Sequence, residues 1–446
     1  MLKRIIIFIG GMILVSSSFA ADASKEELKD YRCVSNGLRL PLVWRSASQP
    51  RIFSRYRRKA MVDMTGELKL IFPTFYMGRV KPSKLVTEYP FPNDVEIQAG
   101  IEPSFKMSNE NLETSPRVVG NTITYRKGDK GTYRIITVDL GDKVIKKGDW
   151  YGIWVALENL AGTNNVPYTR LIGDSQEQIY ECSYTSSGTS FIKNDFIRNA
   201  TKLPLIVLKR NYIMGFSPVA ILAKTDYDGD VWAIIGSSIP EGYYDIKGNQ
   251  YGDKNANLGY ADKLISTKLG APSVNLSKGS DRLEACATEL KGRMDILKIC
   301  GVTKVHIGLG GNDLYSGIKI MHNSALKIYK KIKDYNPLLE IIGGTTLPHS
   351  RSTDDFKTLA GQTPNYVDNG PESTRGKWNA LLRTDCKSAG FDNIFELCSY
   401  VEYDWKNTGG KWKENGKTPK DFTPDGTHPT CAGSEAIAEH AYLIND

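Results

Sequence analysis

The chain has 446 residues, of which 40% are hydrophobic and 24% charged, and its formal net charge is +8. This composition excludes a disordered chain and a membrane-embedded one, and the length predicts two domains rather than one. The positive charge permits attraction to acidic glycans or to an anionic envelope without requiring it. No helix-turn-helix or zinc-finger pattern is present, so nucleic acid is not an expected partner.

The first 20 residues have the pattern of a secretory signal peptide. Lys3 and Arg4 precede an apolar run at 5–15, and Ser18 and Ala20 occupy the small positions before a cleavage site. The apolar run is too short to span a bilayer. Removing this segment lowers the formal net charge from +8 to +6. We therefore expect a mature protein that is periplasmic or secreted and has no stable membrane insertion.

The pattern of residues 21–224 predicts an all-β domain. The expected architecture is an antiparallel sandwich, of which a jelly roll is one form. Short β-rich runs alternate with Gly, Asn, Asp and Pro turns, and no convincing helix interrupts them. The basic run at 51–59 is either a polyanion-binding strip or a solvated strand face. Expected strands lie at 68–72, 95–98, 122–125, 133–138, 150–155 and 204–208.

Residues 225–446 predict an α/β domain, entered through a polar linker at 224–230. Apolar strands alternate with amphipathic helices, which indicates a parallel sheet flanked by helices, with its sites at the carboxyl ends of the strands. The expected strands are 231–235, 273–276, 305–309, 340–346 and 394–397, and the expected helices are 260–269, 281–299, 325–332 and 431–442.

Small polar turns follow several of these strands. Ser238 lies in the turn 236–242 directly after the first strand, where its hydroxyl would reach the carboxyl edge of the sheet, although a serine there can also be a helix cap. Gly279 lies after the second strand and could offer a backbone N–H. Asn312, in the segment 310–313, carries an amide that can donate to an oxyanion. A simple turn and helix cap would also explain that segment.

The segment Asp425–Pro429 places an acid three residues before His428 in a turn stiffened by Gly and Pro. Such an acid can fix the tautomer of the imidazole, which a serine nucleophile requires, although a plain turn has the same pattern. Among the other histidines, His306 is expected in the core, whereas His322 and His440 are expected at the surface. The sequence gives no ground for assigning a structural or catalytic role to His349.

These blocks, in the order Ser, Gly, Asn and Asp with His, resemble the SGNH (GDSL-like) hydrolase family over roughly residues 225–445. The resemblance implies a flavodoxin-like three-layer domain with a parallel sheet and a triad of Ser238, Asp425 and His428. It also implies an oxyanion hole formed by the backbone N–H groups of Ser238 and Gly279 and by the Asn312 side chain. No cofactor or metal is implied.

One position departs from the family pattern, because Ser237 stands where the family has Asp in its Gly-Asp-Ser block. A literal copy occurs at Gly173–Ser175. We reject it because it lies in the β-rich half and no strand-helix unit follows it. Ser238, by contrast, opens the first such unit.

By resemblance, an exported SGNH enzyme with a leading β domain removes ester groups, O-acetyl groups above all, from polysaccharide or peptidoglycan. Its partners would be acylated carbohydrate or another small ester. Two alternatives remain open. One is a lipase, thioesterase or acyltransferase with the same triad, and the other is an inactive glycan-binding relative.

The seven cysteines would enter a compartment where disulfides form, and the odd number leaves at least one thiol without an internal partner. Local bridges Cys286–Cys300 and Cys386–Cys398 and a long-range bridge Cys33–Cys182 are the expected pairs. No C-x-x-C motif is present, which argues against a cysteine-based zinc site or redox motif.

Overall fold

The structure is a computed structural model of the chain. It describes residues 27–41, 45–46, 51–79, 85–105, 117–129, 131–161, 165–167, 169–170, 178–182, 196–199, 214–243, 259–368, 370–406, 409–414 and 418–444. The predicted signal peptide, the expected strand at 204–208 and the segment Gly173–Ser175 lie outside these residues.

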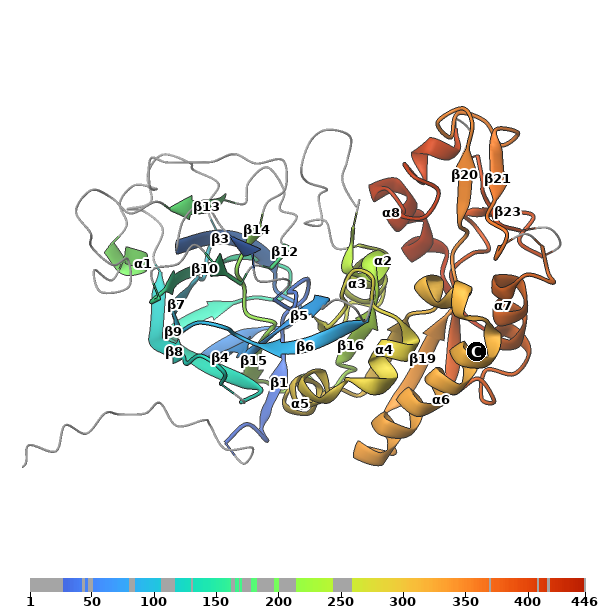
Figure 1. Cartoon of the computed structure of the whole chain (residues 1–446). Helices are drawn as coiled ribbons and strands as arrows, with labels where there is room; N and C mark the ends of the chain where they lie inside the picture. Colours follow the sequence, from blue (N-terminus) through green and yellow to red (C-terminus); the bar gives the residue numbers. More distant parts are fainter. Residues whose placement is uncertain are drawn as a thin grey trace, which may run out of the picture.

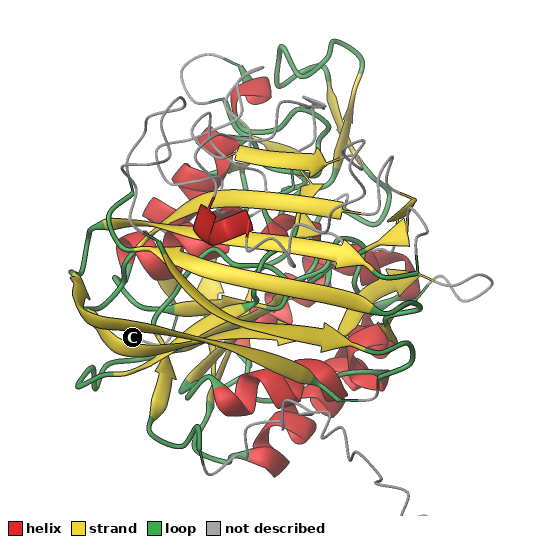
Figure 2. Cartoon of the chain, turned by 90° about the vertical axis from the view of Figure 1, so that its left-hand side faces the viewer, coloured by secondary structure: helices red, strands yellow, loops and turns green. Residues whose placement is uncertain are grey.

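The N-terminal half contains two larger antiparallel sheets (Figures 1 and 2). One has the strand order β1-β15-β4-β9 and the other β13-β3-β10-β7-β8. Each of the five expected strands in the described part of this half lies inside one of these strands. The strands are β1 (Tyr31–Cys33), β3 (Arg51–Lys59), β4 (Met64–Pro73), β7 (Val95–Glu102), β8 (Val118–Tyr125), β9 (Tyr133–Ile145), β10 (Trp150–Asn159), β13 (Gln178–Cys182) and β15 (Ala220–Lys224).

Shorter elements complete this half of the chain. β5 and β6 form a two-stranded antiparallel pair, β2 pairs with β11, and β12 pairs with β14. Their bounds, with that of one short helix, are β2 (Arg45–Ser46), β5 (Phe75–Arg79), β6 (Val86–Pro90), β11 (Asn165–Val166), β12 (Thr169–Arg170), β14 (Met214–Gly215) and α1 (Phe196–Asn199).

The two larger sheets share one apolar core. Alternate residues of β4, among them Leu68 and Leu70, pack in the same cluster as Ile97 of β7 and Ile153 of β10. A period of two along each strand sends every second side chain to this common side. The hydrophobic alternation that predicts the strands is therefore also what joins the sheets.

The basic run in β3 is largely internal, so a solvated strand face is the wrong interpretation of its arginines. Arg51 pairs with Glu158 at 2.6 Å and Arg55 with Glu102 at 3.0 Å, and both arginines are about 1% exposed. The guanidinium of Arg55 also lies over the Trp154 ring. Removing one partner of such a buried pair typically costs about 3–5 kcal/mol, because the other charge stays buried.

The C-terminal half is built on a six-stranded sheet of order β17-β16-β18-β19-β22-β25. The first five strands pair in parallel, as expected, and the last pairs antiparallel with β22. The expected C-terminal helix ends at His440, and the two residues after Ala441 form this edge strand. The strands are β16 (Trp232–Gly236), β17 (Ser273–Asn275), β18 (Lys304–Gly308), β19 (Glu340–Gly344), β22 (Asn393–Glu396) and β25 (Tyr442–Leu443).

Helices cover both faces of this sheet, because the side chains of β16 alternate between two apolar clusters. Ala233 and Ile235 pack with residues of α4 to α7, whereas Trp232 and Ile234 pack with residues of α3 and α8. The helices are α2 (Ser238–Glu241), α3 (Gly259–Asp262), a π-helical turn η2 (Lys263–Lys268), α4 (Leu283–Thr288), α5 (Lys291–Ile299), a 3-10 turn η3 (Gly311–Ser316), α6 (Ile318–Tyr335), α7 (Thr374–Thr384), a 3-10 turn η4 (Pro419–Asp421) and α8 (Cys431–His440).

Beside the sheet, two antiparallel hairpins extend the upper right of the molecule in Figure 1. They pair β20 with β21 and β23 with β24. Their bounds are β20 (Ser350–Ser352), β21 (Gln362–Pro364), β23 (Glu402–Tyr403) and β24 (Lys411–Trp412).

The single helix expected at 281–299 is two helices, α4 and α5. The carbonyl of Glu289 accepts a hydrogen bond from the buried Arg293 guanidinium at 2.8 Å, and Leu290 is not helical. The carboxylate of Glu88, from β6 in the other half, accepts the Gly292 amide at 2.6 Å and so caps the first turn of α5. Contacts to distant residues therefore outweigh the continuous helical spacing.

The two halves pack against each other through a continuous core and buried polar contacts. Tyr31 and Cys33 of β1 belong to the same apolar cluster as Ala233 of the parallel sheet. Arg39 forms an ion pair with Asp262 at 2.8 Å and donates to the Glu241 carbonyl at 3.1 Å. The segment before β3 therefore reaches the helix that begins at Ser238.

None of the expected disulfides is present among the six cysteines whose side chains are described, all of which are buried free thiols. Cys286–Cys300 and Cys386–Cys398 are thus wrong as pairs, and so is Cys33–Cys182, because Cys33 is one of these free thiols. Cys300 instead lies beside Cys33, whose backbone N–H donates to the Cys300 carbonyl at 2.9 Å. The packing of β1 against the end of α5 brings these two residues together.

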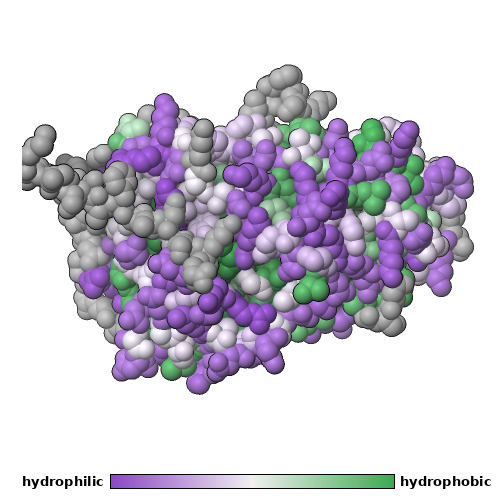
Figure 3. Space-filling view, turned by 90° about the horizontal axis from the view of Figure 1, so that it is seen from below, coloured by the Kyte–Doolittle hydropathy of each residue, from purple (hydrophilic) through white to green (hydrophobic). Residues whose placement is uncertain are grey.

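The molecular surface in Figure 3 is mainly hydrophilic, with hydrophobic residues in small separate groups. Among the described apolar and aromatic side chains, those of Leu338 and Tyr366 have the largest exposed fractions. Within the described ranges, no helix has both the length and the apolar character needed to cross a membrane.

Candidate active site

The turn after β16 places Ser238 at the carboxyl edge of the parallel sheet, as the first residue of α2. Gly236 is the last residue of β16 and lies against the Pro240 ring. A methyl group at Gly236 would lie 2.5 Å from that ring. Ser237 is buried, whereas Ser238 is partly exposed. The local sequence therefore turns the second serine, and not the first, toward the surface.

The three residues predicted as a triad lie in hydrogen-bond contact. Ser238 Oγ is 2.9 Å from His428 Nε2, and His428 Nδ1 is 2.8 Å from Asp425 Oδ2. Because a carboxylate can only accept at Nδ1, that nitrogen carries the proton and Nε2 accepts from the serine hydroxyl. This arrangement can remove a proton from Ser238 and stabilise the imidazolium that results.

The acid is held by its own turn. Asp425 Oδ1 accepts the backbone N–H groups of Thr427 at 2.9 Å and His428 at 2.8 Å. Partial burial alone would raise the pKa of Asp425, but the hydrogen bonds from the His428 ring and backbone outweigh it and lower that pKa. The carboxylate therefore stays charged beside the imidazole at neutral pH.

Neighbouring segments fix the position of this turn. Gly426 has φ +78° and packs on the Ser350 carbonyl, so only glycine fits there without strain. Its own carbonyl accepts the Ser350 amide at 2.9 Å and the Trp412 indole N–H at 3.0 Å. The Tyr243 ring meets the edge of the His428 ring, with centroids 4.9 Å apart.

Asn312 has an amide suited to an oxyanion hole. Its Nδ2 donates to the Asp281 carbonyl at 3.0 Å, and a primary amide has a second N–H to offer. The next residue, Asp313, accepts the Leu283 amide at 3.0 Å, and burial raises its pKa to about 7. The two side chains thereby tie the segment 310–313 to the start of α4, and the oxyanion role of Asn312 stays a prediction.

We expect Asn312→Ala to lower kcat for p-nitrophenyl acetate by about 100-fold to 1,000-fold, the usual cost of losing one oxyanion donor. KM should change little, because the donor acts mainly on the charge that develops during reaction. Steady-state kinetics measure both constants. Asn336→Ala, at the end of α6, is the matched control and should keep wild-type kinetics; a kcat for Asn312→Ala within threefold of wild type would remove Asn312 from the oxyanion hole.

Gly279 lies beside the nucleophile, and a methyl group there would sit 3.8 Å from Ser238 Cβ. Its backbone N–H is engaged by the carboxylate of Glu241, the last residue of α2. A backbone amide has a single hydrogen to donate. The oxyanion role of Gly279 thus stays a prediction that requires Glu241 to release this N–H.

Glu241 was not identified from the sequence, because its contact with Gly279 joins two turns that are distant along the chain. Glu241 lies three residues after Ser238, at the end of α2. The only available signal was an acid near the nucleophile turn, and that signal does not identify a partner.

His349 is a second histidine beside the site that the sequence did not single out. A methyl group at Gly311 would lie 3.1 Å from its ring, next to Asn312. Its Nδ1 donates to the Leu347 carbonyl at 3.1 Å, which leaves Nε2 as the acceptor. Burial, with the charge of Arg375, lowers the pKa of His349 to about 4, so the ring is neutral at pH 7.

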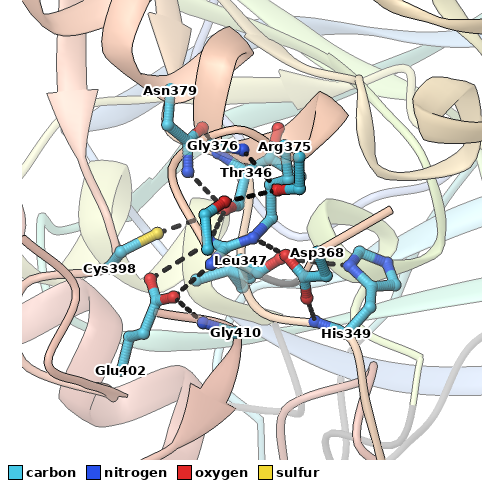
Figure 4. Close-up of polar contacts among 12 residues, drawn as sticks. Thr346, Leu347, His349, Asp368, Arg375, Gly376, Asn379, Cys398, Glu402 and Gly410 are labelled. Carbon is cyan, nitrogen blue, oxygen red and sulfur yellow. Dashed lines mark hydrogen bonds and ion pairs between the residues drawn. The ribbon is translucent and has the colours of Figure 1, made fainter. Parts of the chain in front are cut away.

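A buried charge network supports the loop that carries His349 (Figure 4). Arg375 forms ion pairs with Asp368 and Glu402 and donates to the Thr346 carbonyl at 2.9 Å. Asp368 in turn accepts the His349 backbone N–H. Since Ser350 contacts Gly426, this network reaches the turn of Asp425 and His428.

The remaining histidines lie away from the triad. His306 is fully buried, as expected, and accepts from the Tyr260 hydroxyl at 2.9 Å. Burial lowers the pKa of His306 to about 4. His440 is exposed, also as expected, whereas His322 is only partly exposed and contacts the Ser388 carbonyl.

Comparison with solved structures returns proteins of the group that the sequence blocks resemble. A GDSL-like lipase from Parabacteroides merdae matches at 15% identity and a TM-score of 0.32, over 47% of this chain and 92% of that chain. A lipolytic protein of the G-D-S-L family from Desulfitobacterium hafniense matches at 14% identity and a TM-score of 0.33, over 47% of this chain and 97% of that chain.

A third match spans both halves of the chain. It is an active-site mutant of a family two carbohydrate esterase from Clostridium thermocellum, at 12% identity and a TM-score of 0.31, over 92% of this chain and 90% of that chain. No protein-family model and no curated protein sequence matches.

Proposed function

We propose that the protein is a serine ester hydrolase of the SGNH type, with Ser238 as nucleophile, His428 as base and Asp425 as its orienting acid. The observation that carries this proposal is the contact chain from Ser238 Oγ through the His428 ring to Asp425 Oδ2, with both distances below 3.0 Å. Nucleophile, base and orienting group within hydrogen-bond reach are the requirement for acyl transfer through a serine.

In the proposed reaction His428 Nε2 takes the Ser238 proton while Oγ attacks the ester carbonyl. The oxyanion that forms is stabilised by the Ser238 backbone N–H and by the free N–H of the Asn312 amide, with the Gly279 N–H joining when Glu241 moves away. His428 then gives its proton to the leaving alcohol, which breaks the ester bond and leaves an acyl-enzyme. Water, activated by the same His428, releases the acid and restores Ser238.

We propose O-acetyl groups on polysaccharide or peptidoglycan as the substrate. The support is the signal-like segment 1–20, which suggests a periplasmic or secreted enzyme, together with a β-rich half ahead of the site. In this proposal 21–224 is a β-sandwich domain that narrows the cleft or contacts the glycan. Residues 225–446 form the three-layer hydrolase domain.

The test is hydrolysis of p-nitrophenyl esters by the protein lacking residues 1–20, together with labelling by a fluorophosphonate. We expect hydrolysis of the acetate, a slower rate for the octanoate, and a label on the peptide that contains Ser238. Preference for the octanoate would replace the deacetylase proposal with a lipase or thioesterase. Absence of both hydrolysis and labelling would overturn the enzyme proposal in favour of a glycan-binding protein.

A further inference from the structure

A cavity of about 210 Å³ lies between the two halves, away from the triad. It is bounded by the end of β3, the turn between β9 and β10, and the π-helical turn η2. Gly270, on its wall, precedes β17, so the cavity lies toward the amino end of the parallel sheet, whereas Ser238 lies at the carboxyl end. The lining residues are Asn36, Arg58, Lys59, Ala60, Met61, Lys147, Gly148, Trp150, Ser266, Thr267 and Gly270.

The lining is strongly basic. It includes Arg58, Lys59 and Lys147, and no Asp or Glu is among the described residues that form it. Arg58 is 3% exposed and donates to the carbonyls of Arg57 and Gly37. Three positive charges around one small cavity favour an anion there, because a partly dehydrated site strengthens Coulomb attraction.

The lysines of this cavity differ from the other cations nearby. Arg51 and Arg55 of the same strand are neutralised by Glu158 and Glu102, and Lys146 pairs with Asp63 at 2.9 Å. In the part of the chain that the structure describes, neither Lys59 nor Lys147 forms such an ion pair. Asp63 accepts the Lys147 backbone N–H at 2.8 Å and attracts its charge, but neither ammonium group is held in an ion pair by the residues described, so both can contact a bound anion.

A buried asparagine also lines this space. Asn36 is 4% exposed, lines the cavity, and its Oδ1 has no hydrogen-bond partner in the described structure. An acceptor buried in this way costs free energy unless a donor reaches it. A ligand that has hydroxyl groups as well as a negative charge would suit both the asparagine and the lysines of this wall.

The third feature of the cavity is an aromatic side chain. The indole of Trp150 is part of the wall, and the Arg57 guanidinium lies 4.2 Å from the ring centroid. Thr267 adds a side-chain hydroxyl, whereas the hydroxyl of Ser266 donates to the Asp262 carbonyl at 2.5 Å. An aromatic surface combined with hydroxyl and amide groups suits the apolar face and the hydroxyls of a sugar ring, and the basic groups suit a carboxylate.

We propose that this cavity binds an acidic sugar unit, a hexuronate residue of a polysaccharide chain. Its carboxylate would lie among Arg58, Lys59 and Lys147, and its ring hydroxyls would lie near Asn36 and Thr267. The site goes beyond the proposed ester hydrolysis, because it would retain an acidic polymer at a distance from Ser238 whether or not the ester reaction occurs.

The experiment is isothermal titration of the protein lacking residues 1–20 with a trimer of α-1,4-linked galacturonate, with maltotriose as the neutral trimer and inorganic phosphate as the simple anion. We expect binding of the galacturonate trimer that weakens with salt, and much weaker binding of the other two. Equal affinity for phosphate would overturn the sugar site in favour of a general anion site, and equal affinity for maltotriose would overturn the role of charge.

Lys59→Glu and Lys147→Glu should each weaken the binding of the galacturonate trimer by about tenfold or more, since each replaces an attraction by a repulsion at short range. Lys146→Glu is the matched control, adjacent in sequence but outside the lining, and should keep wild-type affinity. All three residues are exposed, so folding should be preserved. Equal effects of Lys146→Glu and Lys147→Glu would place the binding elsewhere.

Hydrolysis of p-nitrophenyl acetate by Lys147→Glu should equal that of wild type. A loss of trimer binding with unchanged ester hydrolysis supports two separate sites. Unchanged trimer binding in both lysine variants overturns the cavity proposal and leaves the proposed ester hydrolase untouched.

Discussion

Ser238→Ala is expected to lower kcat/KM for p-nitrophenyl acetate by about 10,000-fold to 1,000,000-fold, the range seen when a triad nucleophile is removed. The reason is that Ser238 Oγ, 2.9 Å from His428 Nε2, is the proposed nucleophile, and without it the acyl-enzyme cannot form. Fluorophosphonate labelling should disappear in the same variant. The fold should be unaffected, because Ser238 is partly exposed and its side-chain bond is to His428.

Ser175→Ala and Ser237→Ala are the matched controls. Ser175 belongs to the literal Gly-Asp-Ser copy, and Ser237 is the buried neighbour of the nucleophile. Ser175→Ala should keep wild-type kinetics, and Ser237→Ala should lose no more than a small part of the activity. If Ser175→Ala were inactive and Ser238→Ala active, the choice of serine would be wrong.

The strands of the parallel sheet were predictable because both of their faces are buried. A continuous apolar run such as 231–235 has few alternatives, and the turn that follows it carries the nucleophile. The edge strand β25 was not predictable, since two residues are too few to form a pattern, and it exists through pairing with β22. The break between α4 and α5 likewise depends on Glu88, which belongs to β6 in the other half of the chain.

In the candidate site, the sequence identified the residues whose partners are local or follow a fixed order of blocks. Asp425 and His428 share one turn, and their contact follows from a spacing of three. Glu241 and His349 were missed because their positions depend on tertiary packing, Glu241 against Gly279 and His349 against Gly311. Sequence spacing contains no information on either of these two contacts.

Asp425→Asn is expected to lower kcat/KM by about 10,000-fold, because the substitution places the wrong tautomer of His428 beside Ser238. In the native protein Asp425 Oδ1 accepts two backbone N–H groups while Oδ2 accepts from His428 Nδ1. An asparagine would keep its oxygen on the backbone donors, so its NH₂ would face Nδ1. The imidazole would then move its proton to Nε2, which could no longer accept the Ser238 proton.

Thermal unfolding should separate this effect from loss of structure, since the asparagine retains the turn and Tm should shift by only a few degrees. Asp334→Asn, at an exposed ion pair with Lys330 on α6, tests whether the same chemical change matters elsewhere and should leave the kinetics unchanged. Fluorophosphonate labelling of Ser238 should slow together with ester hydrolysis, because both reactions need the base. An Asp425→Asn enzyme within tenfold of wild type would mean that another group orients His428, and the neutral His349 ring beside the same loop would then be the residue to replace next.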